Sequence, residues 1–240
     1  MLGMKLIVAN WKMHKTQKQS LQFARKVKNI GKRNKVILCP PYTDLCPLAP
    51  LIKKSKIQLG AQDVFYELKG AFTGEISPLM LKELNVTYVI VGHSERRNIL
   101  KESDNIINKK LRACLKNNLT PILCIGENKH QRTFGQTQHF LRKQIINALK
   151  GVKKQKIKDI IIAYEPLWAI GSGKPDTPED ANRTHKFIRS VIKLLDRNAA
   201  QHISILYGRK HQHKERIFIP QTRKHKWCTH WKRFIKSNSF

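Results

Sequence analysis

Acidic residues are scarce in this chain of 240 residues, which has 16 Asp and Glu against 47 Lys and Arg and a formal net charge of +31. Such a surplus attracts polyanions without specificity at low salt. It is spread along the whole sequence and is mostly lysine, and a coding bias toward Lys, Asn and Ile accounts for it as well as nucleic-acid binding does. We therefore expect no specific nucleic-acid partner for residues 1–208.

Long hydrophobic runs are also missing. None approaches the roughly 20 residues of a membrane-spanning helix, so we expect no membrane partner, and the first residues lack the pattern of a secretory signal. The hydrophobic fraction of 40% is nevertheless enough for a core. The few cysteines have no metal-ligand spacing, which indicates reduced thiols and a cytoplasmic protein; they are Cys39, Cys46, Cys114, Cys124 and Cys228.

Short β-branched runs recur along the chain and alternate with amphipathic segments. They are too apolar for a half-exposed sheet and predict parallel strands buried on both sides; they span 5–9, 35–39, 57–61, 87–92, 120–126, 157–164 and 202–208. Between them, helices are predicted over 16–30, 103–117, 135–150 and 178–195. Repeated strand–helix units of this kind predict an α/β fold with a parallel sheet.

Polar side chains follow several of these strands. Asn10 and Lys12 come after the first strand, His93 after the fourth, and Glu165 at the end of the sixth. Taken alone, each of these is most often a solvated loop residue. In a βα barrel, however, the carboxyl ends of the strands surround one mouth, where active sites lie. The sequence therefore predicts that Lys12, His93 and Glu165 converge.

The chain resembles the triosephosphate isomerase family over residues 4–208. The matching segments are VANWKMHK (8–15), GAQDVF (60–65), GAFTGEIS (70–77), YVIVGHSERR (88–97), LTPILCIGE (119–127), YEPLWAIGSGKPDTPEDA (164–181) and ILYG (205–208). The resemblance implies a (β/α)₈ TIM barrel as a single domain over 1–240. It implies interconversion of dihydroxyacetone phosphate and glyceraldehyde 3-phosphate by proton transfer, without a metal or an organic cofactor.

The family pattern also implies residue roles. It makes Glu165 the base and His93 a neutral electrophile, while Lys12 and Asn10 bind the substrate. Gly171, in the loop 166–174, offers a backbone N–H to the phosphate.

Supporting roles follow from the same pattern. Glu95 organises Lys12, and Ser94 lies near Glu165. Thr73 is the tip of a loop that enters a second copy of the chain, so a homodimer is implied.

The match ends abruptly after Gly208. Residues 209–240 hold ten Lys and Arg, four His and one acidic residue, and every one of the 12 glycines of the chain precedes this segment. The family pattern has a Ser after the seventh strand and a Gly-Gly pair after the eighth, and neither is present here. Losing hydrogen bonds to a charged phosphate at about 1.5–3 kcal/mol each would weaken substrate binding by orders of magnitude. No eighth strand is recognisable.

Two other interpretations of this segment remain open. Trp227, Trp231 and Phe234 lie among basic residues and could stack on bases, which would make the chain an impaired isomerase remnant with a tail that binds nucleic acid nonspecifically. A metal site is the weaker alternative, because Lys and Arg surround its candidate ligands and their spacing is irregular. Those ligands are His211, His213, Cys228 and His230.

We hypothesise that residues 210–236 are read in a shifted frame. Back-translation with suitable synonymous codons, read one nucleotide later, gives SINTKKEFLSHKPENINGALIGKGSLK, which supplies the Ser and a glycine-rich loop after a hydrophobic strand. We expect the nucleotide sequence across codons 208–236 to encode such a peptide in another frame. If no frame offset gives it, the hypothesis fails.

Overall fold

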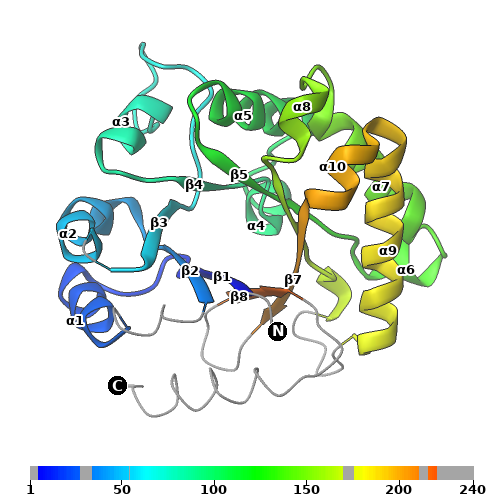
Figure 1. Ribbon diagram of the computed structural model, residues 1–240, viewed down its shortest axis with the longest axis horizontal. Coiled ribbons are helices and arrows are strands. Elements are labelled where there is room, and N and C mark those ends of the chain that lie inside the picture. Colours follow the sequence, from blue (N-terminus) through cyan, green and yellow to red (C-terminus); the bar gives the residue numbers. More distant parts are fainter. Residues whose placement is uncertain (1–4, 28–33, 54, 170–175, 211–215, 221–240) are drawn as a thin grey trace.

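The computed structural model describes residues 5–27, 34–53, 55–169, 176–210 and 216–220, and in these ranges strands alternate with helices around a closed barrel (Figure 1). The strands are β1 (Lys5–Asn10), β2 (Asn34–Cys39), β3 (Ile57–Ala61), β4 (Tyr88–Val91), β5 (Thr120–Ile125), β6 (Ile161–Tyr164), β7 (Ser204–Lys210) and β8 (Arg216–Pro220). Neighbours from β1 to β7 pair in parallel. The predicted α/β barrel and its seven parallel strands are confirmed.

Helices pack around the outside of this barrel. The longer ones are α1 (Gln17–Val27), α2 (Tyr42–Ile52), α5 (Asp104–Lys116), α7 (Thr137–Leu149) and α9 (Pro178–Leu195). The shorter ones are α3 (Pro78–Glu83), α4 (Ser94–Asn98), α6 (Lys129–Thr133), α8 (Lys154–Ile157), α10 (Arg197–His202) and the 3-10 turn η2 (Leu167–Ala169). Among the described residues, no helix has both the length and the apolar composition needed to cross a bilayer.

The strand that closes the barrel runs in the opposite direction to the others. β8 pairs antiparallel with β7, where Tyr207 lies opposite Ile219, and with β1, where Asn10 lies opposite Arg216. The sequence analysis recognised no eighth strand, and the structure corrects this, because residues 216–220 form one. The antiparallel strand was not predicted, because its Ile-Phe-Ile core is only three residues long and lies in a strongly basic segment.

The strands are buried on both faces. Side chains at alternating positions form one cluster, which includes Val8, Ile37, Ile90 and Leu206. The residues between them, such as Val89, belong to a second cluster shared with the helices. Because successive side chains of a strand point to opposite faces, the first cluster fills the barrel and the second seals it against the helices.

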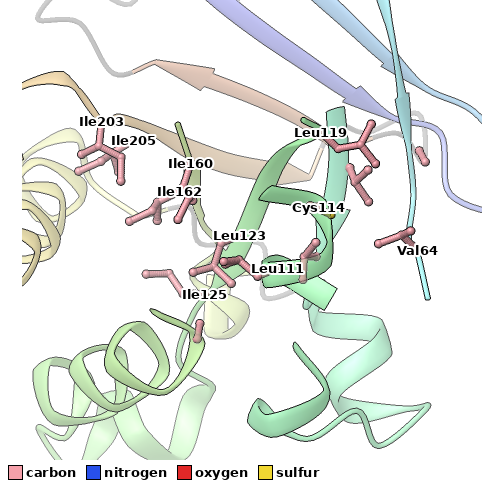
Figure 2. Packing of buried hydrophobic residues seen from close by; sticks show 14 of the residues in the cluster. Val64, Leu111, Cys114, Leu119, Leu123, Ile125, Ile160, Ile162, Ile203 and Ile205 are labelled. Carbon is pink, nitrogen blue, oxygen red and sulfur yellow. The ribbon is translucent and has the colours of Figure 1, made fainter. Parts of the chain in front are cut away.

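Figure 2 shows the second cluster where β5, β6 and β7 meet their helices. Leu123 and Ile125 of β5 lie near Leu111 of α5, and Ile162 and Ile205 continue the layer across β6 and β7. This continuous apolar layer fixes the strands, and it thereby fixes the loops at their carboxyl ends.

Helix α9 begins and ends where the sequence predicted. Thr177 is its N-cap and accepts a hydrogen bond from the backbone N–H of Asp180, and Pro178 occupies the first turn. Two strand starts were wrong. The run 157–164 was expected to be one strand, but Ile157 ends α8 and β6 begins at Ile161. The run 202–208 was also expected to be a strand, but His202 ends α10 and β7 begins at Ser204. Periodicity alone does not separate a short buried helix from a strand.

Candidate active site

The loop after β1 presents Lys12 in an unusual backbone conformation. Lys12 has a φ of 54°, in the left-handed region that side chains other than glycine seldom adopt. Its N–H donates to Asn10 Oδ1 at 2.9 Å, and its carbonyl accepts from Gln62 Nε2 at 2.8 Å. Two neighbouring amide side chains therefore hold the strained turn, and one of them, Gln62, was not singled out from the sequence.

Helix α4 begins directly after β4 and positions an imidazole. His93 is the N-cap, and its Nδ1 accepts the backbone N–H of Glu95 at 3.2 Å. Because a backbone N–H only donates, Nδ1 carries a lone pair, and the ring is neutral with its proton on Nε2. Oε2 of Glu95 lies 3.5 Å from Nδ1, farther than the backbone N–H, while Oε1 pairs with the ammonium of Lys12. We therefore assign Nδ1 as the acceptor of the backbone N–H.

Glu165 directly follows β6 and is almost fully buried, with 1% of its surface exposed. One carboxylate oxygen lies 3.3 Å from Nε2 of His93, and the other accepts the N–H of Ser94 at 3.3 Å. Its backbone passes so close to Gly126 that a Cβ there would lie 1.8 Å from the Glu165 carbonyl oxygen. Only glycine fits at position 126, which gives this residue a packing role in the site.

These contacts join the predicted residues into one group at the carboxyl ends of β1, β4 and β6. Lys12 pairs with Glu95, Glu95 borders His93, and His93 faces Glu165. A buried carboxylate next to a neutral N–H donor can exchange protons with a small molecule placed beside both groups, and the ammonium supplies charge for an anion. Gly171 lies outside the described residues.

None of the described contacts joins Thr73 to this group. It is exposed in the turn between β3 and α3, beside Gly74, which has a φ of 90°. The aromatic rings of Phe65 and Phe72 pack 4.7 Å apart between their centroids and support the turn.

A second carboxylate, which the sequence analysis did not single out, lies behind Glu165. Glu127 accepts hydrogen bonds from Tyr164 Oη at 3.0 Å and from Trp168 Nε1 at 2.9 Å. Burial raises the pKa of Glu127. Its place at the end of β5 was the signal that could have identified it, since the other polar residues were chosen on the same ground.

The imidazole of His185 is half-buried, and its Nε2 is shielded from solvent. The ring of His185 on α9 packs 6.2 Å from the ring of Tyr164 and 6.5 Å from that of Tyr207, between centroids. Its Nε2 has no hydrogen-bond partner within the described ranges. Burial, aided by the charge of Arg189, lowers the pKa of His185 to about 4.

The fold and this group define a class: a βα-barrel enzyme equipped for proton transfer at its mouth. A family profile for triosephosphate isomerase matches residues 5–216. The triosephosphate isomerase of Caldanaerobacter subterraneus subsp. tengcongensis is 47% identical over 206 residues, which cover 85% of this chain and 83% of the relative. Those of Dictyoglomus turgidum and Aquifex aeolicus are 44% and 47% identical over 85% of this chain and 84% and 83% of theirs. The chain belongs to the triosephosphate isomerase family.

The half-buried imidazole of His185 predicts a specific pH dependence of stability. The pKa of His185 lies below its ordinary value of 6.5 in the folded state, at about 4, so the unfolded chain binds a proton more readily. The stability that the neutral ring contributes is complete above pH 6.5 and is lost as the pH falls toward 4. We expect His185→Phe to reduce the slope of unfolding free energy against pH in this window, measured by urea titration. Substitution of the exposed His139 by Phe should leave the slope unchanged, and an equal effect of both variants would contradict the assignment.

Proposed function

We propose that this chain interconverts dihydroxyacetone phosphate and D-glyceraldehyde 3-phosphate through an enediol(ate), a step of glycolysis and gluconeogenesis. The contact of Glu165 with His93 supports the proposal, because a carboxylate and an imidazole next to each other could act as base and proton donor on one small molecule. The membership of the chain in the triosephosphate isomerase family supports it. The reaction moves only protons, so the mechanism requires no metal or organic cofactor.

Glu165 is the proposed base. Its carboxylate removes a proton from the carbon that bears the hydroxyl group and returns it to the neighbouring carbon, so one group serves both halves of the reaction. With 1% of its surface exposed, the carboxylate is kept from bulk water and can act directly on a proton of the substrate. The N–H of Ser94 orients this carboxylate.

His93 is the proposed electrophile. Its Nε2–H donates to the carbonyl oxygen of the substrate and passes protons between the two substrate oxygens. The ring is neutral because the N–H of Glu95 occupies Nδ1. A neutral donor suits the weakly acidic hydroxyls of an enediol better than an imidazolium would, since the proton must also return.

Lys12 and Asn10 are the proposed substrate-binding residues at the carboxyl end of β1. The ammonium of Lys12 attracts the phosphate and stabilises charge on the enediolate, while Glu95 fixes its position in the free protein. Gly171 is proposed as an additional phosphate donor on the basis of the family pattern alone.

We also propose a cytoplasmic homodimer in which Thr73 and its loop contact a second copy of the chain. Exposed apolar side chains support this proposal. Met13, next to Lys12, is 94% exposed, Phe72 is 42% exposed, and Met80 is 52% exposed. Met and aromatic side chains are enriched in protein interfaces relative to the rest of the surface.

The base assignment predicts the effect of removing one ionisable group. Glu165→Gln keeps the shape of the side chain but removes the basic oxygen, so we expect kcat to fall by about 10² to 10⁴-fold in a coupled isomerase assay. Glu179→Gln, an exposed change on α9, serves as the control. The assay should include a chain whose residues 210–235 are restored to the alternative frame. An active preparation that tolerates Glu165→Gln contradicts the base assignment, and inactivity of both parent chains contradicts the proposed function.

The interface predicts a change of mass in solution. Phe72→Asp places a charge in the proposed contact, so we expect the dimer to dissociate to monomers, as measured by sedimentation velocity. Leu194 is 72% exposed on α9, away from this loop, and Leu194→Asp should leave the mass unchanged. A parent chain that is monomeric at micromolar concentration would contradict the proposal.

A further inference from the structure

The guanidinium group of Arg132 contacts two residues on the carboxyl side of Glu165, namely Trp168 and Asp180. The Cζ atom of Arg132 lies 4.8 Å from the centroid of the Trp168 ring, and its Nη2 lies 3.2 Å from Oδ2 of Asp180. Trp168 stands three residues after Glu165, and Asp180 lies in the first turn of α9. Arg132 therefore connects the turn η2, which follows Glu165, with helix α9.

The position of Arg132 is itself well defined. It lies on α6, a short helix whose N-terminus is closed by a capping box in which Asn128 and Gln131 exchange hydrogen bonds with each other's backbone. The backbone N–H of Arg132 donates to the carbonyl of Asn128 at 3.1 Å. The side chain thus extends from a fixed turn at the end of β5.

The partners of Arg132 are also anchored on their other sides. The indole N–H of Trp168 donates to Glu127 at 2.9 Å, and Leu167 N–H donates to the Glu127 carbonyl at 3.0 Å. Asp180 is held at the N-terminus of α9 by the Thr177 cap. A planar guanidinium can cover an aromatic face and pair with a carboxylate at its edge at the same time.

We propose that Arg132 is a positioning residue that holds Trp168 against Glu127 and ties it to Asp180 of α9, so that the backbone carrying Glu165 is fixed on its carboxyl side. This inference rests on the proposed function for its effect on turnover, but not for its structural content. Arg132 touches neither Glu165 nor His93 in the described contacts, so its influence passes through Trp168.

The chain offers a matched control for this proposal. Arg183 pairs with the other oxygen of Asp180, but its side chain is 79% exposed and the described contacts do not join it to Trp168. Removing Arg183 therefore takes a cation from the same carboxylate without uncovering the indole. Any effect that comes only from the charge of Asp180 would be common to both variants.

Tryptophan fluorescence tests the structural part directly. The chain has four tryptophans, so the Trp168 component is taken as the difference between each protein and the same protein with Trp168→Phe. We expect Arg132→Met to shift this component to longer wavelength and to increase its quenching by acrylamide, because one indole face loses its cover. Arg132→Lys should give an intermediate shift, since an ammonium lacks the planar group, and Arg183→Met should give none. An unchanged Trp168 component in Arg132→Met, or an equal change in Arg183→Met, would overturn the proposal.

Kinetics test the consequence for turnover in an active preparation. We expect Arg132→Met to lower kcat about ten-fold with a smaller change in KM, because a displaced Glu165 loses alignment in the reacting complex, and Arg132→Lys should recover part of the loss. A shifted Trp168 component with unchanged kcat would overturn the role in positioning Glu165. If the parent chain is inactive, the proposed function fails, while the fluorescence comparison still decides whether Arg132 holds Trp168.

Discussion

Closure of the sheet is the constraint on which the site depends. Lys12, His93 and Glu165 follow β1, β4 and β6, and they meet because these strands belong to one barrel. β1 is the critical member, since it needs a neighbour on each side and only β2 pairs with it in parallel. On the other side β8 pairs with Val8, Ala9 and Asn10. The position of Asn10 at the mouth is therefore tied directly to the antiparallel strand.

An antiparallel strand can take this place because backbone pairing has few sequence requirements. Each N–H and C=O of an edge strand needs a partner, and a strand of either direction can supply one. β-branched and aromatic residues favour such pairing, and the Ile-Phe-Ile core of β8 is of this type. Closure through a short strand also removes the open edges of β1 and β7, which would otherwise be free to pair with other chains.

Much of this architecture could be predicted from the sequence, and the exceptions have physical causes. The strands up to β7 were predictable, because a strand buried on both faces has consecutive apolar residues, such as Val89 and Ile90. Helix α9 was predictable, because a helix buried on one face has apolar residues three or four positions apart, such as Ile188 and Val191. Helix α2 was not predicted, since it contains Pro47 and Pro50, which normally argue against a helix.

The residues of the site likewise divide into those that the sequence pattern identifies and those that it does not. His93 and Glu165 were identifiable by their place after strands, whereas the contact between Arg132 and Trp168 joins residues 36 positions apart and leaves no periodic trace.

The structural and chemical consequences of the altered C-terminal segment are thus separable. Pairing with β1 and β7 requires only a backbone in the right register, which residues 216–220 provide. Binding of a phosphate requires particular N–H and hydroxyl donors at fixed points, and the Ser and Gly-Gly of the family pattern do not follow Gly208 here. A segment can therefore satisfy the first condition and fail the second. For this reason a closed barrel with Glu165 and His93 in contact does not by itself supply the phosphate donors of the family pattern, and the proposed function places more of the phosphate binding on Lys12.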